Sequence, residues 1–221
     1  MLNEIFVLTL TLILICLLRW GFRTLPGEEW QILGCIPTIK KADGSWNAVN
    51  LTYYGFFNAA AYTLAVGLFF MLTGSLHLPF ISALAVILAV LGVCMPASRL
   101  LAFAVEGKRH TFTVGGAFFS GLFVAPAAIL LVNVTLGEWM GFDIPLLHML
   151  AAMSIAYAMG EGVGRLSCIS FGCCYGKPLS ACHPLVARIF ARWHFVFSGE
   201  TKKIAYAHQL DGQKVVPIQG L

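Results

Sequence analysis

From Gly44 to Ser98 the chain carries no Asp, Glu, Lys or Arg. Charged side chains make up about 25% of an ordinary soluble protein, whose surface they keep in water. Here they make up 11% of the 221 residues, while hydrophobic residues make up 59%. These proportions exclude a disordered chain, a coiled coil and a soluble globular domain. They predict an all-α, polytopic integral membrane protein.

Five apolar stretches predict transmembrane helices within a single membrane domain that covers residues 1–221. A helix needs about 17 to 25 apolar residues to cross a bilayer. The turn Gly74–Pro79 separates the second helix from the third, which Pro96 and Arg99 are expected to end. The predicted helices lie near residues 4–22, 53–73, 79–96, 115–135 and 145–164.

The segments between and after these helices differ in character. Residues 24–50 are polar and turn-rich and predict an extramembrane loop, whereas residues 99–113 are half apolar and predict a segment in the interface plane. Residues 166–221 predict a polar C-terminal segment without a further span. Four basic side chains of that segment are expected on a solvated face near anionic lipid head groups: Arg188, Arg192, Lys202 and Lys203.

The basic residues are distributed asymmetrically along the chain. All 14 Lys and Arg fall in residues 19–52, 97–114 and 161–221, which share one side of the membrane if the five helices alternate. The positive-inside rule then predicts that this side faces the cytoplasm. No basic patch with interleaved aromatic residues indicates a nucleic-acid partner, so the expected surroundings are membrane lipids.

The stretch from Gly160 to Pro178 holds the densest group of chemically active residues. Glu161 and Arg165 are spaced i, i+4 and therefore share a helix face at the end of the fifth predicted helix. Glycines before Arg165 allow a close backbone approach or a broken helix. An ion pair at this depth either serves function or snorkels to the interface, and the spacing leaves both interpretations open.

The residues Gly164-Arg165, Gly172 and Tyr175-Gly176 together resemble the signature of the prolipoprotein diacylglyceryl transferase family. Further pieces follow in the family's order over about residues 50 to 219: Tyr54-Gly55, Phe112-Thr113-Val114-Gly115-Gly116 and Val216-Pro217-Ile218-Gln219. The resemblance implies an enzyme of the cell inner membrane. Such an enzyme moves diacylglycerol from phosphatidylglycerol to a cysteine thiol of a prolipoprotein.

The resemblance also implies a set of site residues. Arg165 would hold the phosphate, because a guanidinium binds phosphate with two parallel hydrogen bonds. Tyr54 would orient the lipid head group. The other implied substrate-binding residues are Gly115, Gly116, Gly164, Cys168, Gly172, Tyr175, Gly176 and Gln219. No cofactor and no bound metal are expected.

The chain departs from the family's pattern at four positions. Val114 and Val216 stand where the family has histidines. Cys168 replaces an asparagine of the signature, and Cys173 replaces a glutamate. The family also keeps its signature on the extracytoplasmic side, whereas the charge distribution predicts the cytoplasmic side for Arg165.

The reaction requires a group that removes the proton of the acceptor thiol, because the thiolate is the nucleophile. Candidates for this base are His110, Glu161 and Cys173. Together with Arg165 they form the predicted catalytic group.

Cysteines offer a different interpretation of the same stretch. Cys168, Cys173, Cys174, Cys182 and His183 bring five soft ligands or reactive thiols into 16 residues. The spacing lacks a C-x-x-C pair and matches no strong metal template. Metal binding, a redox pair such as Cys168 with Cys173, a nucleophilic thiol and plain packing of a tight turn all stay open.

Two alternative functions therefore accompany the transferase hypothesis. One is a lipid- or thiol-modifying membrane enzyme in which Cys168, Cys173 and Cys174 carry the chemistry. The other is a non-catalytic membrane protein that binds phospholipid.

Overall fold

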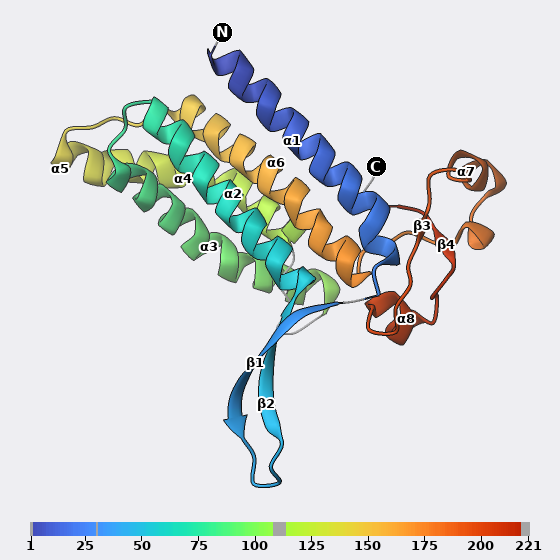
Figure 1. The fold of residues 1–221 in the computed structure, drawn as a ribbon. Coiled ribbons are helices and arrows are strands. Elements are labelled where there is room, and N and C mark those ends of the chain that lie inside the picture. Colours follow the sequence, from blue (N-terminus) through green and yellow to red (C-terminus); the bar gives the residue numbers. More distant parts are fainter. Residues whose placement is uncertain (1, 30, 108–113, 218–221) are drawn as a thin grey trace. The chain divides into compact units, whose positions relative to one another are not determined.

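The fold comes from a computed structural model that describes residues 2–29, 31–107 and 114–217. Its long helices are α1 (Leu2–Thr24), α2 (Tyr53–Ser75), α3 (Phe80–Glu106), α4 (Val114–Val132) and α6 (Leu146–Phe171) (Figure 1). In the described part of the chain, five helical segments are long and apolar enough to cross a membrane. This confirms the predicted all-α, multi-pass membrane fold. Contacts group the chain into two units, Met1–Leu64 with Met159–Leu221, and Ala65–Ala158.

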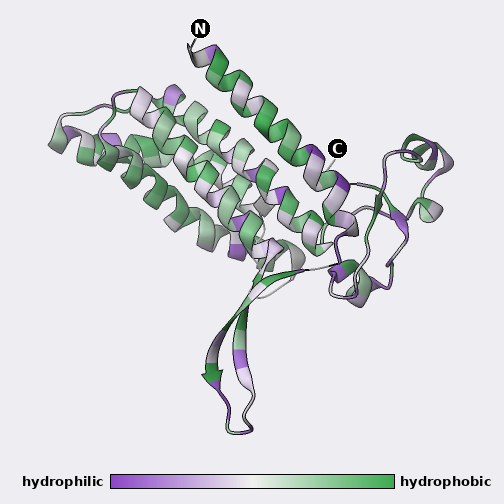
Figure 2. Cartoon of the chain, in the orientation of Figure 1, coloured by the Kyte–Doolittle hydropathy of each residue, from purple (hydrophilic) through white to green (hydrophobic). Residues whose placement is uncertain are grey.

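The membrane-spanning helices present most of their side chains outward. Between 6% and 28% of the residues in each span are buried, and Figure 2 shows hydrophobic residues along the long helices. Hydroxyl groups within these helices donate to the carbonyl four residues earlier. Thr9 Oγ1 donates to Ile5 O at 2.7 Å, and Thr63 Oγ1 donates to Ala59 O at 2.9 Å. Such bonds remove unsatisfied polar groups from an apolar environment, where each would cost several kcal/mol.

The third helix is longer than predicted. α3 passes through Pro96 and ends at Glu106, and Gly107 follows in the left-handed conformation with a φ of 65°. The prediction of an interfacial segment is therefore wrong for residues 99–106. An internal proline removes one helical hydrogen bond, and helices in membranes tolerate this loss more readily than helices in water.

The unit Ala65–Ala158 contains α3 packed against α4. Small and branched residues fill its interior, among them Ala83, Val86, Ala102, Ala125, Ala128, Ile129 and Val132. After α4 the chain forms a π-helical turn, Asn133–Gly137, and the short α5, Glu138–Met140. The Asn133 side chain accepts from Ile144 N at 2.9 Å and donates to Ile144 O at 3.0 Å. These bonds fix the connection that leads into α6.

In the other unit, the predicted loop 24–50 contains a β-hairpin. After the 3₁₀ turn η1 (Leu25–Gly27), β1 (Ile32–Lys40) pairs antiparallel with β2 (Trp46–Thr52). The turn between them places Gly44 at a φ of 84°. Ile32, Ile36, Ile39 and Val49 are branched residues typical of strands, and the polar composition of the segment obscured this signal.

The C-terminal segment folds into short elements without a further span among its described residues. They are η3 (Leu179–Ala181), α7 (Pro184–Ile189), β3 (Phe195–Val196), α8 (Lys203–His208) and β4 (Lys214–Val215), with β3 paired antiparallel to β4. A hydrophobic core joins this segment to α1, η1, α2 and α6. Its buried members are Leu25, Phe57, Leu166, Ile169, Phe195, Phe197, Ile204 and Val215.

Lys202 is the exception to the expected solvated face. Its side chain is fully buried, and Nζ donates to Leu25 O at 2.8 Å and to Ser170 O at 2.9 Å. Burial lowers the pKa of Lys202 to about 8, and the negative charges of Glu28 and Asp211 oppose this shift. The prediction is wrong for Lys202, whereas Arg188, Arg192 and Lys203 are exposed as expected.

The pKa of Lys202 makes the stability of this unit depend on pH. The unfolded chain has an ordinary lysine pKa of about 10.4, so between pH 8 and 10.4 it binds more protons than the folded chain. The contribution of Lys202 to the free energy of unfolding should therefore rise with pH across this window. We expect Lys202→Met to flatten the rise in thermal midpoint measured in detergent, while the neighbouring Lys203→Met keeps it. Parallel pH curves for wild type and Lys202→Met would contradict this assignment.

Candidate functional site

α6 extends past the predicted end at residue 164 to Phe171, so Glu161 and Arg165 stand on a continuous helix. Arg165 Nη2 lies 2.5 Å from Glu161 Oε1, and the two side chains are 43% and 29% exposed. A pair this accessible to solvent contributes at most about 1 kcal/mol to stability. A guanidinium has five N–H donors, so Arg165 keeps donors for a ligand while Glu161 orients it.

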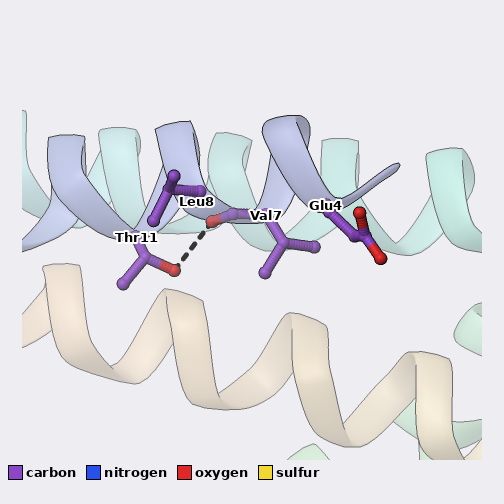
Figure 3. Close-up of a pocket in the computed structure, with 4 residues that line it drawn as sticks. All are labelled: Glu4, Val7, Leu8 and Thr11. Carbon is purple, nitrogen blue, oxygen red and sulfur yellow. Dashed lines mark hydrogen bonds between the residues drawn. The ribbon is translucent and has the colours of Figure 1, made fainter. Parts of the chain in front are cut away.

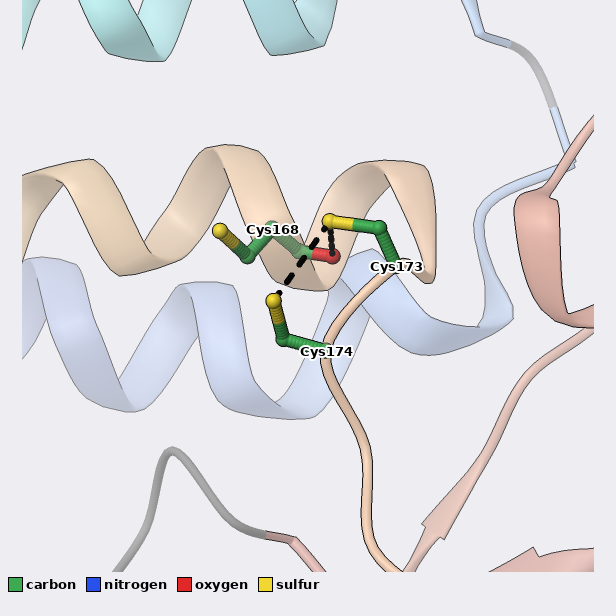
Figure 4. A group of neighbouring side chains, drawn as sticks. All are labelled: Cys168, Cys173 and Cys174. Atoms are coloured by element: carbon green, nitrogen blue, oxygen red, sulfur yellow. Dashed lines mark hydrogen bonds between the residues drawn. The ribbon is translucent and has the colours of Figure 1, made fainter. Parts of the chain in front are cut away.

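Three cysteine side chains lie together beyond Arg165. Cys168 belongs to the last turns of α6, and Cys173 and Cys174 follow directly after the helix (Figure 4). The three sulfur atoms lie within 4.8 Å of one another, and Cys173 Sγ is 3.7 Å from Cys174 Sγ. None of the seven cysteines, all of them among the described residues, forms a disulfide. We call these three residues the thiol cluster.

Gly172 turns the chain so that the thiol cluster can form. It adopts a φ of 63°, a left-handed conformation that favours glycine at the end of a helix. Gly172 N donates to Ile169 O at 3.2 Å, and Cys173 N donates to Cys168 O at 3.2 Å. A Cβ at this position would approach Ile204 Cγ2 to 3.1 Å. The predicted importance of Gly172 is therefore explained locally by a turn that packs against the C-terminal segment.

The surroundings of Cys173 and Cys174 shift the pKa values of these two thiols in opposite directions. Hydrogen bonds with the thiols of Cys168 and Cys173, and then the positive charges of Arg165 and Lys203, hold the pKa of Cys174 well below its ordinary value. Hydrogen bonds with the other two thiols and burial raise the pKa of Cys173. The arrangement favours one negative charge on the cluster, held between two cationic side chains.

Other predicted residues surround this cluster. Tyr54, at the start of α2, lies within electrostatic range of all three cysteines, and its ring contacts Phe171 edge-on at 5.5 Å between centroids. Tyr175 packs against Phe197 with ring centroids 6.0 Å apart. Burial and the neighbouring Cys173 raise the pKa of Tyr175.

Two further predicted glycines, Gly164 and Gly176, lie in the same unit. Gly164 faces α2, since a Cβ there would lie 3.7 Å from Ala61 Cβ. Gly176 N donates to Val216 O at 2.8 Å, which fixes the chain after Tyr175.

The remaining predicted residues stand apart from this group. Gly115 and Gly116 lie in the first turn of α4 and belong to the unit Ala65–Ala158. His110 and Gln219 lie outside the described residues.

Two residues of the group were absent from the predicted site set. Cys174 was weighed only as part of the alternative function, although its adjacency to Cys173 is visible in the sequence. Lys203 was treated as a solvated surface lysine. No sequence signal links it to a cysteine 29 positions away, because the contact depends on how the C-terminal segment folds.

Two surface depressions on the described part of the chain are lined by residues other than the thiol cluster. One lies on α1 and is lined by Glu4, Val7, Leu8 and Thr11, with Thr11 Oγ1 donating to Val7 O at 2.8 Å (Figure 3). Because all four residues come from one exposed face of one helix, this depression is a lipid-facing surface. A second lies along the π-helical turn Asn133–Gly137.

No protein-family model, curated protein or solved structure matches the chain. A cation, a carboxylate, phenolic hydroxyls and three thiols at the end of a membrane helix can bind an anionic head group and bind or modify a thiol.

The spacing of the thiol cluster can be tested with arsenite, which binds three neighbouring thiols in a pyramidal complex. We expect the reduced protein to retain about one arsenic atom per chain in intact mass spectra, since the sulfur atoms lie within 4.8 Å. Cys168→Ser should reduce retention strongly, while Cys182→Ser serves as the matched control and should retain arsenic. Equal retention in both variants would mean that the cluster does not form.

Proposed function

We propose that this protein is a membrane enzyme that moves diacylglycerol from phosphatidylglycerol to a cysteine thiol, similar to the prolipoprotein diacylglyceryl transferases. The supporting observation is the position of Arg165. It is a half-exposed cation near the end of a membrane helix, within electrostatic range of Cys168 and Cys174, and Tyr54 is within range of the same thiols. The phosphate of a phospholipid lies at about the depth of Arg165 in the membrane. The site therefore brings a lipid phosphate and thiol groups to the same place.

Helix length supports this depth. α6 has 26 residues and is therefore about 39 Å long, against about 30 Å for the hydrocarbon core of a bilayer. Arg165 stands about 9 Å before the end of the helix at Phe171, near the boundary between acyl chains and head groups. At this depth Arg165 can bind a lipid phosphate, which avoids the cost of leaving an unpaired guanidinium in hydrocarbon.

Each polar side chain then has a defined role. Arg165 binds the phosphate and stabilises the negative charge that develops on the departing glycerol phosphate. Glu161 is a positioning residue that holds the guanidinium through their ion pair. Tyr54 donates a hydrogen bond to the head group. The lipoprotein-modifying function and a location in the cell inner membrane are parts of the same proposal.

The first test is transfer of labelled diacylglycerol from phosphatidylglycerol to a lipobox peptide by the purified protein in detergent. We expect Arg165→Ala to lower kcat/KM by about 100-fold or more, and Arg165→Lys by about 10-fold or more, because lysine keeps the charge but loses the paired donors. Arg188→Ala, an exposed arginine of α7, is the control and should retain the wild-type rate. Transfer that is insensitive to Arg165→Ala would overturn the assigned phosphate contact.

A second candidate function is a lipid- or thiol-modifying enzyme whose own cysteine is the nucleophile. The depressed pKa of Cys174 favours it, because a thiolate reacts faster than a thiol. Labelling of individual cysteines with and without phosphatidylglycerol discriminates the two. We expect lipid to slow labelling of the thiol cluster but not of Cys182, and a covalent lipid adduct on a cluster cysteine would favour the second function.

Binding without turnover is the outcome that favours a non-catalytic phospholipid-binding protein. Such a protein would show lipid protection of the thiol cluster, no transfer to any thiol and no adduct.

A further inference from the structure

The geometry of the thiol cluster matches the requirements of a tetrahedral metal ion. Zinc binds cysteine sulfur at about 2.3 Å, so two sulfur atoms on one tetrahedral zinc lie about 3.8 Å apart. Cys173 Sγ and Cys174 Sγ are 3.7 Å apart, and Cys168 Sγ lies within 4.8 Å of both. The longest of these separations therefore exceeds the tetrahedral spacing by at most about 1 Å.

The backbone holds these thiols in place without a metal. The left-handed Gly172 and the bond from Cys173 N to Cys168 O return the chain over the last turn of α6. Figure 4 shows Cys168 on the helix and Cys173 and Cys174 on the turn that follows. The sequence spacing resembles no common zinc motif, since one ligand comes from a helix and two adjacent ligands come from a tight turn.

We propose that Cys168, Cys173 and Cys174 form a zinc site whose open fourth position binds the acceptor thiol of the transfer reaction. The identity of that fourth ligand rests on the proposed function, whereas zinc binding by the three cysteines does not. Three protein ligands and one exchangeable position are the usual arrangement of a catalytic zinc.

The positive side chains near the thiol cluster suit a zinc ion that carries three thiolates and an acceptor thiolate. Zinc with three thiolates carries one negative charge, and a bound acceptor thiolate adds a second. The positive side chains of Arg165 and Lys203 both act on Cys174 and would offset this charge. The three cysteines are partly exposed, so both the ion and a substrate thiol can reach them.

A zinc ion would also replace a separate base at this site, because a metal ion deprotonates a coordinated thiol.

The reaction step balances without an oxidant or reductant. The acceptor thiol binds zinc and releases its proton to water. Its sulfur then attacks the glyceryl methylene carbon of phosphatidylglycerol, forming the carbon–sulfur bond. The bond from that carbon to the phosphate oxygen breaks, and glycerol phosphate leaves with the electron pair beside Arg165. Zinc keeps its oxidation state, and the three cysteines are unchanged.

Metal binding is tested on the full chain, purified in detergent under reducing conditions and loaded with Zn²⁺ or Co²⁺. We expect about one ion per chain by elemental analysis and a sulfur-to-cobalt charge-transfer band. The double variant Cys173→Ser/Cys174→Ser should weaken zinc binding by about 100-fold or more, while Cys182→Ser leaves it unchanged. Cys174→His, which keeps a zinc ligand, should still bind cobalt with a shifted spectrum. Absence of binding, binding unaffected by the double variant, or binding of Cu(I) but not Zn²⁺ would overturn the site.

The fourth position is tested without lipid, so that its result is independent of transfer. We expect a cysteine-containing lipobox peptide to shift the visible bands of the cobalt protein, and the same peptide with serine to leave them unchanged. A shift without any transfer would support the zinc site and reject the transferase. Equal transfer rates in zinc-loaded and zinc-free protein would support the transferase and overturn the inference.

Discussion

The buried side chain of Lys202 joins two distant segments of the part of the molecule on which the candidate site stands. Lys202 Nζ donates to Leu25 O, just after α1, and to Ser170 O, in the last turn of α6. Ser170 O lies in the last turn of α6, where carbonyls carry the negative end of the helix dipole, and Leu25 O also accepts from Glu28 N at 3.4 Å. Removing a charge from water costs several kcal/mol, and the lysine is stable in this position only while both carbonyls stay in reach.

The thiol cluster depends on this attachment through a short chain of contacts. Ile204 N donates to Gly172 O at 3.1 Å, so the segment that Lys202 fixes also fixes the left-handed turn before Cys173. The next residue along, Lys203, points to solvent and adds positive charge near Cys174. Two adjacent lysines thus act differently, because one stabilises the fold from inside and the other sets the charge of the site from outside.

The sequence predicted the membrane spans well and the site only in part, for a physical reason. Transfer of a long apolar segment into a bilayer depends on composition, so the charge-free run Gly44–Ser98 was sufficient to place α2 and most of α3. Which lysine is buried depends on packing between residues far apart in the chain, and composition does not contain that information. The thiol cluster was only partly predictable. Its three cysteines are close in the sequence, but their sulfur atoms come together only because the chain turns at Gly172.

The bond between Lys202 and Leu25 has a consequence for the order of events during synthesis. Its two residues are separated by 177 positions, and four of the five spans lie between them. All five spans of the described residues are therefore synthesised before the lysine that joins the first to the last. While the helices insert, the turn carrying Cys173 and Cys174 has no C-terminal segment to rest on. The thiol cluster can take its final form only after that segment has been made.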